Sequence, residues 1–222
     1  MDLAALFSGG KDSTYALYLA QQKGWKVKYL VAAIPSDDSY LFHVPNVRLT
    51  SLHSEAMEIP LKQFEVRGGE EEEMIALQNM LKELDIEGLV TGAVASDYQW
   101  SRFNQIGEDI GVKVFSPLWR KNQKRVMEEI LRAGFDVMIT GVYAEGLDES
   151  WLGRRIDEEC LKDLQLLEQE RGINISGEGG EYETLVLDSP NFKRRLKLEE
   201  VEKDWDGKRG HLRVRKAILA RK

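Results

Sequence analysis

Short apolar runs alternate with segments of helical spacing through the first 145 residues. The apolar runs cover residues 3–7, 27–34, 61–66, 88–94, 112–115 and 137–142. Runs of this length and composition are typical of strands buried on both faces of a parallel sheet. Between them, residues 13–23, 70–84, 98–110 and 123–133 repeat apolar positions at helical intervals. This alternation predicts an α/β domain built on a doubly wound parallel sheet.

The rhythm changes after Tyr143, which places a predicted domain boundary near residue 145. An amphipathic helix is expected to run to a stop at Gly172, followed by a glycine-rich stretch over residues 176–184. A short strand over residues 185–187 comes next. Residues 197–205 and 211–219 flank Asp206-Gly207, which is a strong hairpin signal. Residues 146–222 are therefore predicted to form a smaller α+β domain.

Composition excludes several classes of protein. The 222 residues are 42% hydrophobic and 31% charged, and no apolar run approaches the roughly 20 residues that cross a bilayer. The N-terminus lacks a basic start before its short apolar run, so we expect no signal peptide and a cytoplasmic location. The single cysteine, Cys160, excludes an internal disulfide and a CxxC redox pair, and the three histidines lack the spacing of a zinc site.

Charge is distributed unevenly along the chain. The net charge is -7, yet residues 193–222 carry 12 basic against 5 acidic residues, a surplus of seven positive charges. This segment is either the solvated face of a hairpin, with Val214 and Ile218 buried, or a docking surface for an acidic macromolecule. The acidic remainder of the chain argues against general nucleic-acid binding.

One motif carries specific chemistry. Directly after the first predicted strand the chain reads Ser8-Gly9-Gly10-Lys11-Asp12-Ser13, and a helix follows at once. Glycines allow backbone N–H groups to approach an anion, and a helix N-terminus adds partial positive charge. Two hydroxyls and a lysine suit phosphate, and Asp12 is a candidate ligand of Mg²⁺ or a helix cap. The motif is neither a Walker A loop nor a Rossmann fingerprint.

This loop resembles the SGGxDS loop of the N-type ATP pyrophosphatases, members of the PP-loop superfamily that cleave ATP to AMP and pyrophosphate. Three further blocks, 92–102, 117–119 and 177–184, resemble signature blocks of the diphthine-ammonia ligase family. The resemblance covers nearly the whole chain. It implies a HUP-like sheet in the order 3-2-1-4-5, with ligands at the switch point between strands one and four.

The resemblance also implies the roles of individual residues. Catalytic roles fall on Lys11, Asp12 and Arg102. ATP is expected to contact Ser8, Gly9, Gly10, Lys11, Asp12, Ser13, Ala33, Ile34 and Gly92. The substrate is expected to contact Ser96, Tyr98, Gln99, Glu178, Gly179, Gly180, Glu181, Glu183 and Thr184. Within the substrate group, residues 178–184 form an acidic loop that suits the trimethylammonium group of diphthine, with the ring of Tyr182 as a further contact. The alternatives are plain strand packing for Ala33 and Ile34, a surface position for Arg102, and a merely structural role for the acidic loop.

The implied reaction amidates the carboxylate of diphthine on translation elongation factor 2. It consumes Mg-ATP and ammonium and gives diphthamide, AMP and pyrophosphate through an acyl-adenylate. A homodimer is an open expectation, and the irregular stretch around His43 is either a cover over the nucleotide or a solvated loop. Two rivals remain: a tRNA-modifying adenylase of the same superfamily, and a sensor that binds ATP or AMP without turnover.

Overall fold

The computed structural model describes residues 1–35, 46–66 and 69–222. The irregular stretch around His43 lies outside these residues. The chain divides into two compact units. The first comprises Met1–Ser8 and Asp12–Trp119, and the second comprises Gly9–Lys11 and Arg120–Lys222.

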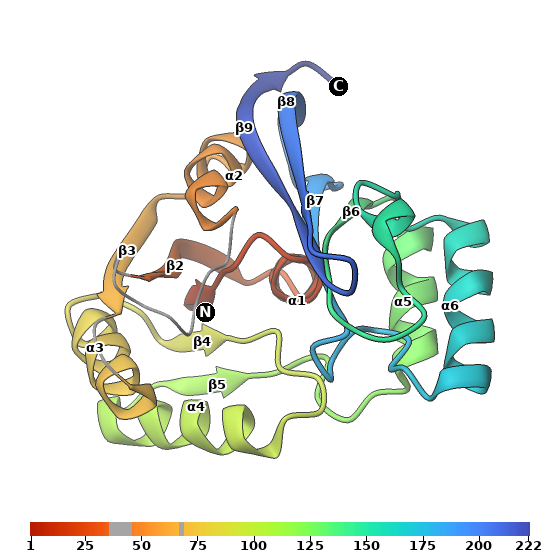
Figure 1. The fold of residues 1–222 in the computed structure, drawn as a ribbon. Coiled ribbons are helices and arrows are strands. Elements are labelled where there is room, and N and C mark those ends of the chain that lie inside the picture. Colours follow the sequence, from red (N-terminus) through yellow and green to blue (C-terminus); the bar gives the residue numbers. More distant parts are fainter. Residues whose placement is uncertain (36–45, 67–68) are drawn as a thin grey trace. The chain divides into compact units, whose positions relative to one another are not determined.

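The first unit is the predicted parallel α/β domain. Its strands are β1 (Asp2–Leu6), β2 (Lys26–Pro35), β3 (Leu61–Val66), β4 (Gly88–Val90) and β5 (Lys113–Phe115). Its helices are α1 (Lys11–Gln22), the 3-10 turn η1 (Val47–Leu49), α2 (Thr50–Met57), α3 (Glu70–Lys82) and α4 (Asp97–Ile110). The strands are all parallel and lie in the order β3-β2-β1-β4-β5 (Figure 1). Both the doubly wound fold and the predicted strand order are confirmed.

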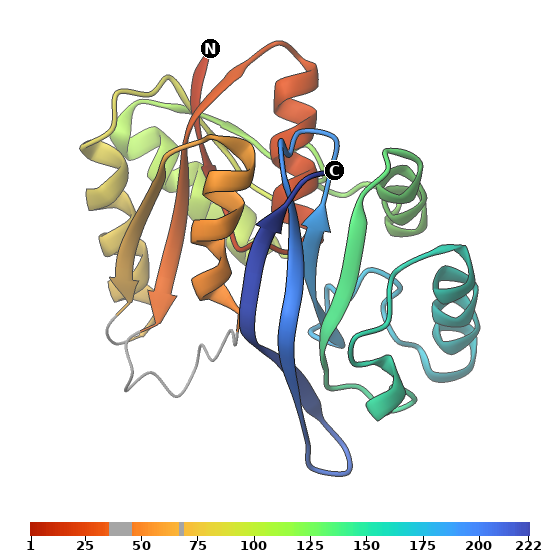
Figure 2. The ribbon, with the colours of Figure 1, turned by 90° about the horizontal axis from the view of Figure 1, so that it is seen from above.

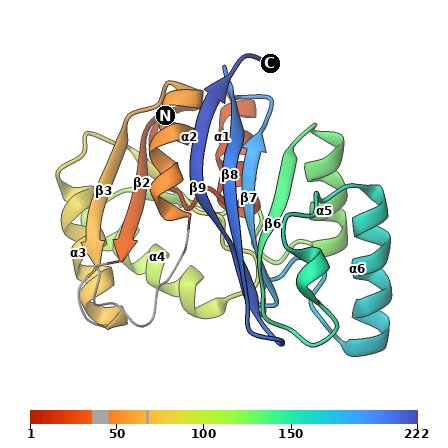
Figure 3. The same ribbon diagram turned by 45° about the horizontal axis from the view of Figure 1, so that its top comes forward.

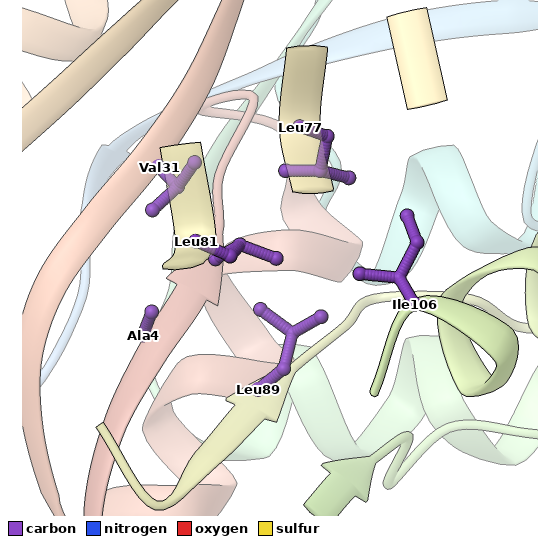
Figure 4. Close-up of a cluster of buried hydrophobic side chains, with 6 residues drawn as sticks. All are labelled: Ala4, Val31, Leu77, Leu81, Leu89 and Ile106. Carbon is purple, nitrogen blue, oxygen red and sulfur yellow. The ribbon is translucent and has the colours of Figure 1, made fainter. Parts of the chain in front are cut away.

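Helices cover both faces of this sheet. Figure 2 shows α1 and α2 on one face and α3 and α4 on the other. The core beneath α3 and α4 contains Ala4, Val31, Leu77, Leu81, Leu89 and Ile106 (Figure 4). Three of these side chains come from neighbouring strands and three from the two helices, and all are at most 5% exposed. Burial of each large apolar side chain stabilises the fold by about 1.5–3 kcal/mol.

The second unit is built on an antiparallel sheet. Its elements are α5 (Gln123–Arg132), β6 (Asp136–Val142), the 3-10 turn η2 (Glu149–Trp151), α6 (Glu158–Arg171), β7 (Tyr182–Asp188), β8 (Arg195–Trp205) and β9 (Gly210–Ala220). The strand order is β7-β6-β9-β8. The predicted hairpin is β8–β9, whose two long strands lie side by side in Figure 3. The predicted stop at Gly172 is the C-cap of α6.

Three features differ from the sequence analysis. The assignment of residues 137–142 to the parallel sheet is wrong, because this segment is β6 and pairs antiparallel with β7 and β9. A run that is apolar on both faces looks the same in either kind of sheet, so its pattern does not identify its partner strands.

The chain divides at Trp119, so α5 also belongs to the second unit, in contrast to the boundary predicted near residue 145. Ile218, which the interpretation as a solvated hairpin face placed inside, is 38% exposed.

Candidate active site

The first glycine loop, residues 8–13, connects β1 to α1. In the first unit its two serines meet: the backbone N–H of Ser8 donates to Oγ of Ser13 at 3.3 Å, and the two hydroxyl oxygens lie 3.1 Å apart. Helix α1 begins inside the loop. Two adjacent hydroxyls at a helix N-terminus form an arrangement that suits an anion.

Gly92 lies against this loop because β4 neighbours β1 in the sheet. A Cβ atom at Gly92 would lie 2.7 Å from the backbone nitrogen of Ser13 and 2.8 Å from the carbonyl carbon of Asp12. Such distances are far shorter than real Cβ contacts. Only glycine therefore allows the segment after β4 to approach the loop this closely. A contact between Gly92 and ATP at this switch point stays a prediction.

The middle of the first glycine loop groups with the second unit. The carbonyl of Gly9 accepts from the backbone N–H of Val186 at 2.9 Å. The backbone N–H of Lys11 donates to Oγ1 of Thr184 at 3.1 Å, and its ammonium group donates to the carbonyl of Ser176 at 2.5 Å. Lys11 is only 3% exposed. Thr184 is thus placed against the loop, as a hydrogen-bond acceptor for backbone.

Tyr182 is buried and faces inward. Its hydroxyl donates to the carbonyl of Ile175 at 2.7 Å, and its ring centroid lies 5.5 Å from Nζ of Lys11. The ring therefore contacts the chain's own ammonium group, in place of the substrate cation that the sequence analysis expected there.

The second glycine loop, residues 176–184, is held by one of its own carboxylates. One oxygen of Glu181 accepts from the backbone N–H of Asn174 at 2.9 Å, and the other accepts from that of Gly179 at 2.8 Å. Gly177 and Gly180 have φ values of +75° and +82° and turn the chain where L side chains would be strained. Glu181 thus braces the loop, while Gly179 and Gly180 are exposed and Glu178 is half-buried.

Glu183 forms a pair with Tyr143, a residue that the sequence analysis did not single out. The two side chains are hydrogen-bonded, with the phenol as donor. Burial raises the pKa of Glu183, and the hydrogen bond from Tyr143 opposes that rise only in part. Burial, followed by the Glu183 charge, raises the pKa of Tyr143. The pair exists because β6 and β7 are neighbours, and that pairing was missed when residues 137–142 were placed in the parallel sheet.

The start of α4 carries the predicted residues that follow β4. Oγ of Ser96 accepts from the backbone N–H of Gln99 at 3.3 Å and caps the helix. Tyr98 is 46% exposed, and the guanidinium of Arg102 lies 5.2 Å from its ring centroid. The structure therefore brings Tyr98 and Arg102 together on one helix face.

Trp100 and Trp119 also stack, although the sequence analysis did not predict the pair. Their ring centroids are 5.3 Å apart and their planes are inclined by 15°. Trp119 lies in the block 117–119 that follows β5, so neighbouring sheet strands deliver the two rings.

Two other predictions concern the nucleotide. Ala33 and Ile34 are half-buried at the end of β2, opposite Phe64 and Glu65 of β3, and an adenine contact there stays a prediction. Within the described residues, no three His, Cys, Asp or Glu side chains are grouped to hold a metal ion. Mg²⁺ is often held by one or two carboxylates and the substrate phosphates. Asp12, in the first turn of α1, fits such a shared site.

The chain matches two known domain families in sequence. Residues 1–114 match the family of the diphthamide synthase N-terminal domain, and residues 122–220 match the family of the diphthamide synthase C-terminal domain. The chain belongs to the diphthamide synthase family. The gap between the two matches contains Trp119, where the two units of the structure also divide.

Relatives in the diphthamide synthase family share about a third of their residues with this chain. A diphthine–ammonia ligase of Homo sapiens is 32% identical over 226 residues, covering 91% of this chain and 84% of that protein. One of Schizosaccharomyces pombe is 31% identical over 241 residues, covering 98% of this chain and 40% of that longer protein.

A solved structure, a predicted subunit of tRNA methyltransferase from Methanocaldococcus jannaschii, aligns with a TM-score of 0.44 at 15% identity. The alignment covers 85% of this chain and 99% of that one. A likeness of this size carries no weight for fold or activity. In the described part of the chain, every helix is too short or too polar to cross a membrane.

Proposed function

We propose that this protein is a diphthine–ammonia ligase, which amidates the carboxylate of diphthine on translation elongation factor 2 with ATP and ammonium. The observation that carries the proposal is the match to both diphthamide synthase domains, together with curated relatives of that name over 91% of the chain. The placement of the first glycine loop at the β1–β4 switch point supports a nucleotide-dependent reaction. The cytoplasm is the proposed location, because elongation factors work there.

ATP is proposed to bind with its phosphates at the first glycine loop. The paired hydroxyls of Ser8 and Ser13 and the N-terminus of α1 support this assignment. Asp12 would hold Mg²⁺ together with the phosphates, and the ion would neutralise charge that develops on the departing pyrophosphate. Arg102 is proposed to pair with a phosphate or with the substrate carboxylate.

The diphthine side chain is proposed to bind near the second glycine loop. A half-buried carboxylate complements a trimethylammonium group better than an exposed one, because less water competes for it. Glu183 and Glu178 have this burial, whereas Glu181 is engaged in bracing the loop. Ser96, Tyr98 and Gln99, at the start of α4 in the first unit, stay predicted substrate contacts of that unit.

The proposed reaction has two displacements. A carboxylate oxygen of diphthine attacks the α-phosphorus of ATP, and pyrophosphate leaves with the bonding electron pair. Ammonium loses a proton, the resulting ammonia attacks the acyl carbon, and AMP leaves with the carboxylate oxygen. A second proton leaves the new amide nitrogen. The protein contributes positioning and charge stabilisation.

Free ammonium is the proposed nitrogen source. Release of ammonia from glutamine commonly uses a reactive cysteine thiolate. The single cysteine, Cys160, is buried in α6, and burial raises the pKa of its thiol to about 11. A thiol of this pKa is almost wholly protonated at neutral pH and is a poor nucleophile.

An AMP-release assay tests the proposal. ATP labelled at the α-phosphate is incubated with the protein, diphthine-bearing elongation factor and ammonium, each omitted in turn. We expect stoichiometric AMP and diphthamide only in the complete mixture. Binding of ATP with no AMP in any mixture would instead indicate a nucleotide sensor, and AMP release that needs tRNA would indicate a tRNA-modifying adenylase.

A further inference from the structure

Lys11 is directed away from the role that its position in the loop suggests. A lysine inside a phosphate loop is expected to neutralise phosphate charge. Here the side chain is 3% exposed, and its ammonium group donates to the carbonyl of Ser176 and lies over the ring of Tyr182. We propose that Lys11 is a positioning residue that holds the second glycine loop in its substrate-binding shape and is not a phosphate ligand. This inference rests on the proposed function.

Several hydrogen bonds join residues 9–11 to β7 and to Ser176, and together they form a tether. The Gly9 carbonyl accepts from Val186, and the Lys11 backbone N–H donates to Thr184. Both partners lie on β7, so residues 9–11 are fastened along that strand. The Lys11 side chain donates to the carbonyl of Ser176, at the start of the second glycine loop.

Ser176 is itself held in place by hydrogen bonds. It is 1% exposed, its backbone N–H donates to Oδ1 of Asn174 at 2.9 Å, and its hydroxyl donates to Oε1 of Gln123 at 2.9 Å. Withdrawal of the ammonium group would remove a charged donor from a buried carbonyl. Such a group is costly to leave without its hydrogen bond. The arrangement therefore favours a lysine that stays in place.

Lys11 is also connected, through Tyr182, to the Glu183 carboxylate that the proposed function uses. Tyr182 and Glu183 are consecutive residues of β7, and consecutive strand residues point to opposite faces. The Tyr182 ring is packed against Lys11, while Glu183 is hydrogen-bonded to Tyr143. Fixing Tyr182 on one face therefore fixes Glu183 on the other.

The test compares Lys11→Met with Lys162→Met, which removes the same charge from an exposed position on α6. Hydrogen exchange is measured for the Gly179, Gly180 and Val186 amides, and the ATP dissociation constant is measured separately. For Lys11→Met we expect these amides to exchange roughly 10- to 100-fold faster, the range that follows from losing a hydrogen bond to a charged group. Amides of β5 should be unaffected, and ATP affinity should stay close to wild type. Lys162→Met should change neither quantity.

Kinetics distinguish positioning from general destabilisation. Lys11→Met should raise the KM for elongation factor with little change in the KM for ATP, and Lys11→Arg, which restores a charged donor, should recover part of the loss. A tenfold weaker ATP affinity with unchanged exchange in the second glycine loop would overturn the proposal and make Lys11 a phosphate ligand.

A second variant keeps the test decisive if Lys11→Met does not fold. Thr184→Val preserves the shape of the side chain but removes the acceptor of the Lys11 backbone N–H. We expect the same amides to exchange faster, by a smaller factor, and unchanged exchange would count against the tether. Exchange needs no turnover, so a wild-type protein that makes no diphthamide would refute the proposed function while the exchange result still decides the tether.

Discussion

The two glycine loops use glycine for different purposes. At the first loop, Gly92 of a neighbouring segment has no Cβ, so its backbone can approach the backbone of Asp12 and Ser13. The hydroxyl groups of Ser8 and Ser13 face one another there. In the second, glycines turn the chain, and the Glu181 carboxylate accepts from the backbone N–H groups of Asn174 and Gly179. A loop whose amides already bind a carboxylate is unsuited to a second anion. This difference supports the proposal that phosphate binds at the first loop and a cation at the second.

The largest expected effect comes from breaking the first loop. Gly92→Ala places a methyl group against the backbone of Asp12 and Ser13, neither of which can rotate away. We expect ATP affinity measured by calorimetry to fall by roughly 100-fold, toward the upper end of overpacking costs. Gly24→Ala is the control, because it adds strain at a φ of +77° but has no atom within 4 Å to displace. It should lower stability and leave ATP affinity intact, and an equal loss of ATP affinity in both variants would contradict the account.

The next effect comes from neutralising the second loop. Glu183→Gln keeps the shape and the hydrogen-bond acceptor for Tyr143 but removes the charge. We expect kcat/KM for elongation factor to fall roughly 30-fold, as for the loss of an interaction with a charged partner, while the ATP dissociation constant changes little. An equal loss of ATP binding would place the second glycine loop at the nucleotide.

The same variant carries a pH prediction. Burial raises the pKa of Glu183 in the folded protein, so the folded state binds its proton more tightly than the unfolded chain does. Ionisation therefore costs stability as the pH rises from the ordinary glutamate range through the raised pKa. Thermal unfolding should show Glu183→Gln more stable than wild type at pH 7, with the difference shrinking as the pH falls below that range. A variant less stable at pH 7 would indicate a structural role for this carboxylate.

A smaller effect is expected at Glu181. Glu181→Gln replaces one of two charged acceptors by an amide, which should cost about 1 kcal/mol of unfolding free energy. Denaturant titration measures this cost, and the amide of Gly179 or Asn174 should lose exchange protection. If stability and both amides are unchanged, the carboxylate does not brace the loop.

The smallest effect concerns the basic hairpin. Arg215 pairs with Glu202 across β8 and β9, and Lys216 pairs with Glu199 at 2.8 Å. Reversing the charges of Arg213, Arg215 and Lys216 should raise the KM for elongation factor by roughly threefold and flatten its salt dependence, because rim charges act mainly on association. The exchanged pair Arg215→Glu with Glu202→Arg keeps the net charge and is the control. An unchanged KM in the folded triple variant would favour a merely solvated face.

Sequence patterns predicted the first unit better than the second for a physical reason. In a parallel sheet, each strand is followed by its crossover helix, so local periodicity and chain order together fix most of the topology. Helix α2 was still missed, since its buried face includes the polar Thr50 and His53. In the second unit β6 finds its partners far along the chain, and no local pattern reports that pairing.

The same limit applies to the candidate site. The first glycine loop and Gly92 could be found from the sequence because short motifs specify backbone geometry. The Lys11–Ser176 and Tyr143–Glu183 contacts could not, because each joins residues that are far apart in the sequence. The acidic residues of the second glycine loop looked equivalent in sequence. Only their contacts separate Glu181, which accepts two backbone hydrogen bonds at the loop, from Glu183, which pairs with Tyr143.

Transfer of isotopically labelled ammonium nitrogen tests the central claim most directly. The protein is incubated with ATP, labelled ammonium and elongation factor bearing diphthine, and the modified histidine is analysed by mass spectrometry while AMP is counted. The account predicts one labelled nitrogen in the carboxamide for each AMP formed, with far less of both products in Gly92→Ala and Glu183→Gln. Unlabelled diphthine in the presence of AMP, or a labelled amide accompanied by ADP, would contradict it.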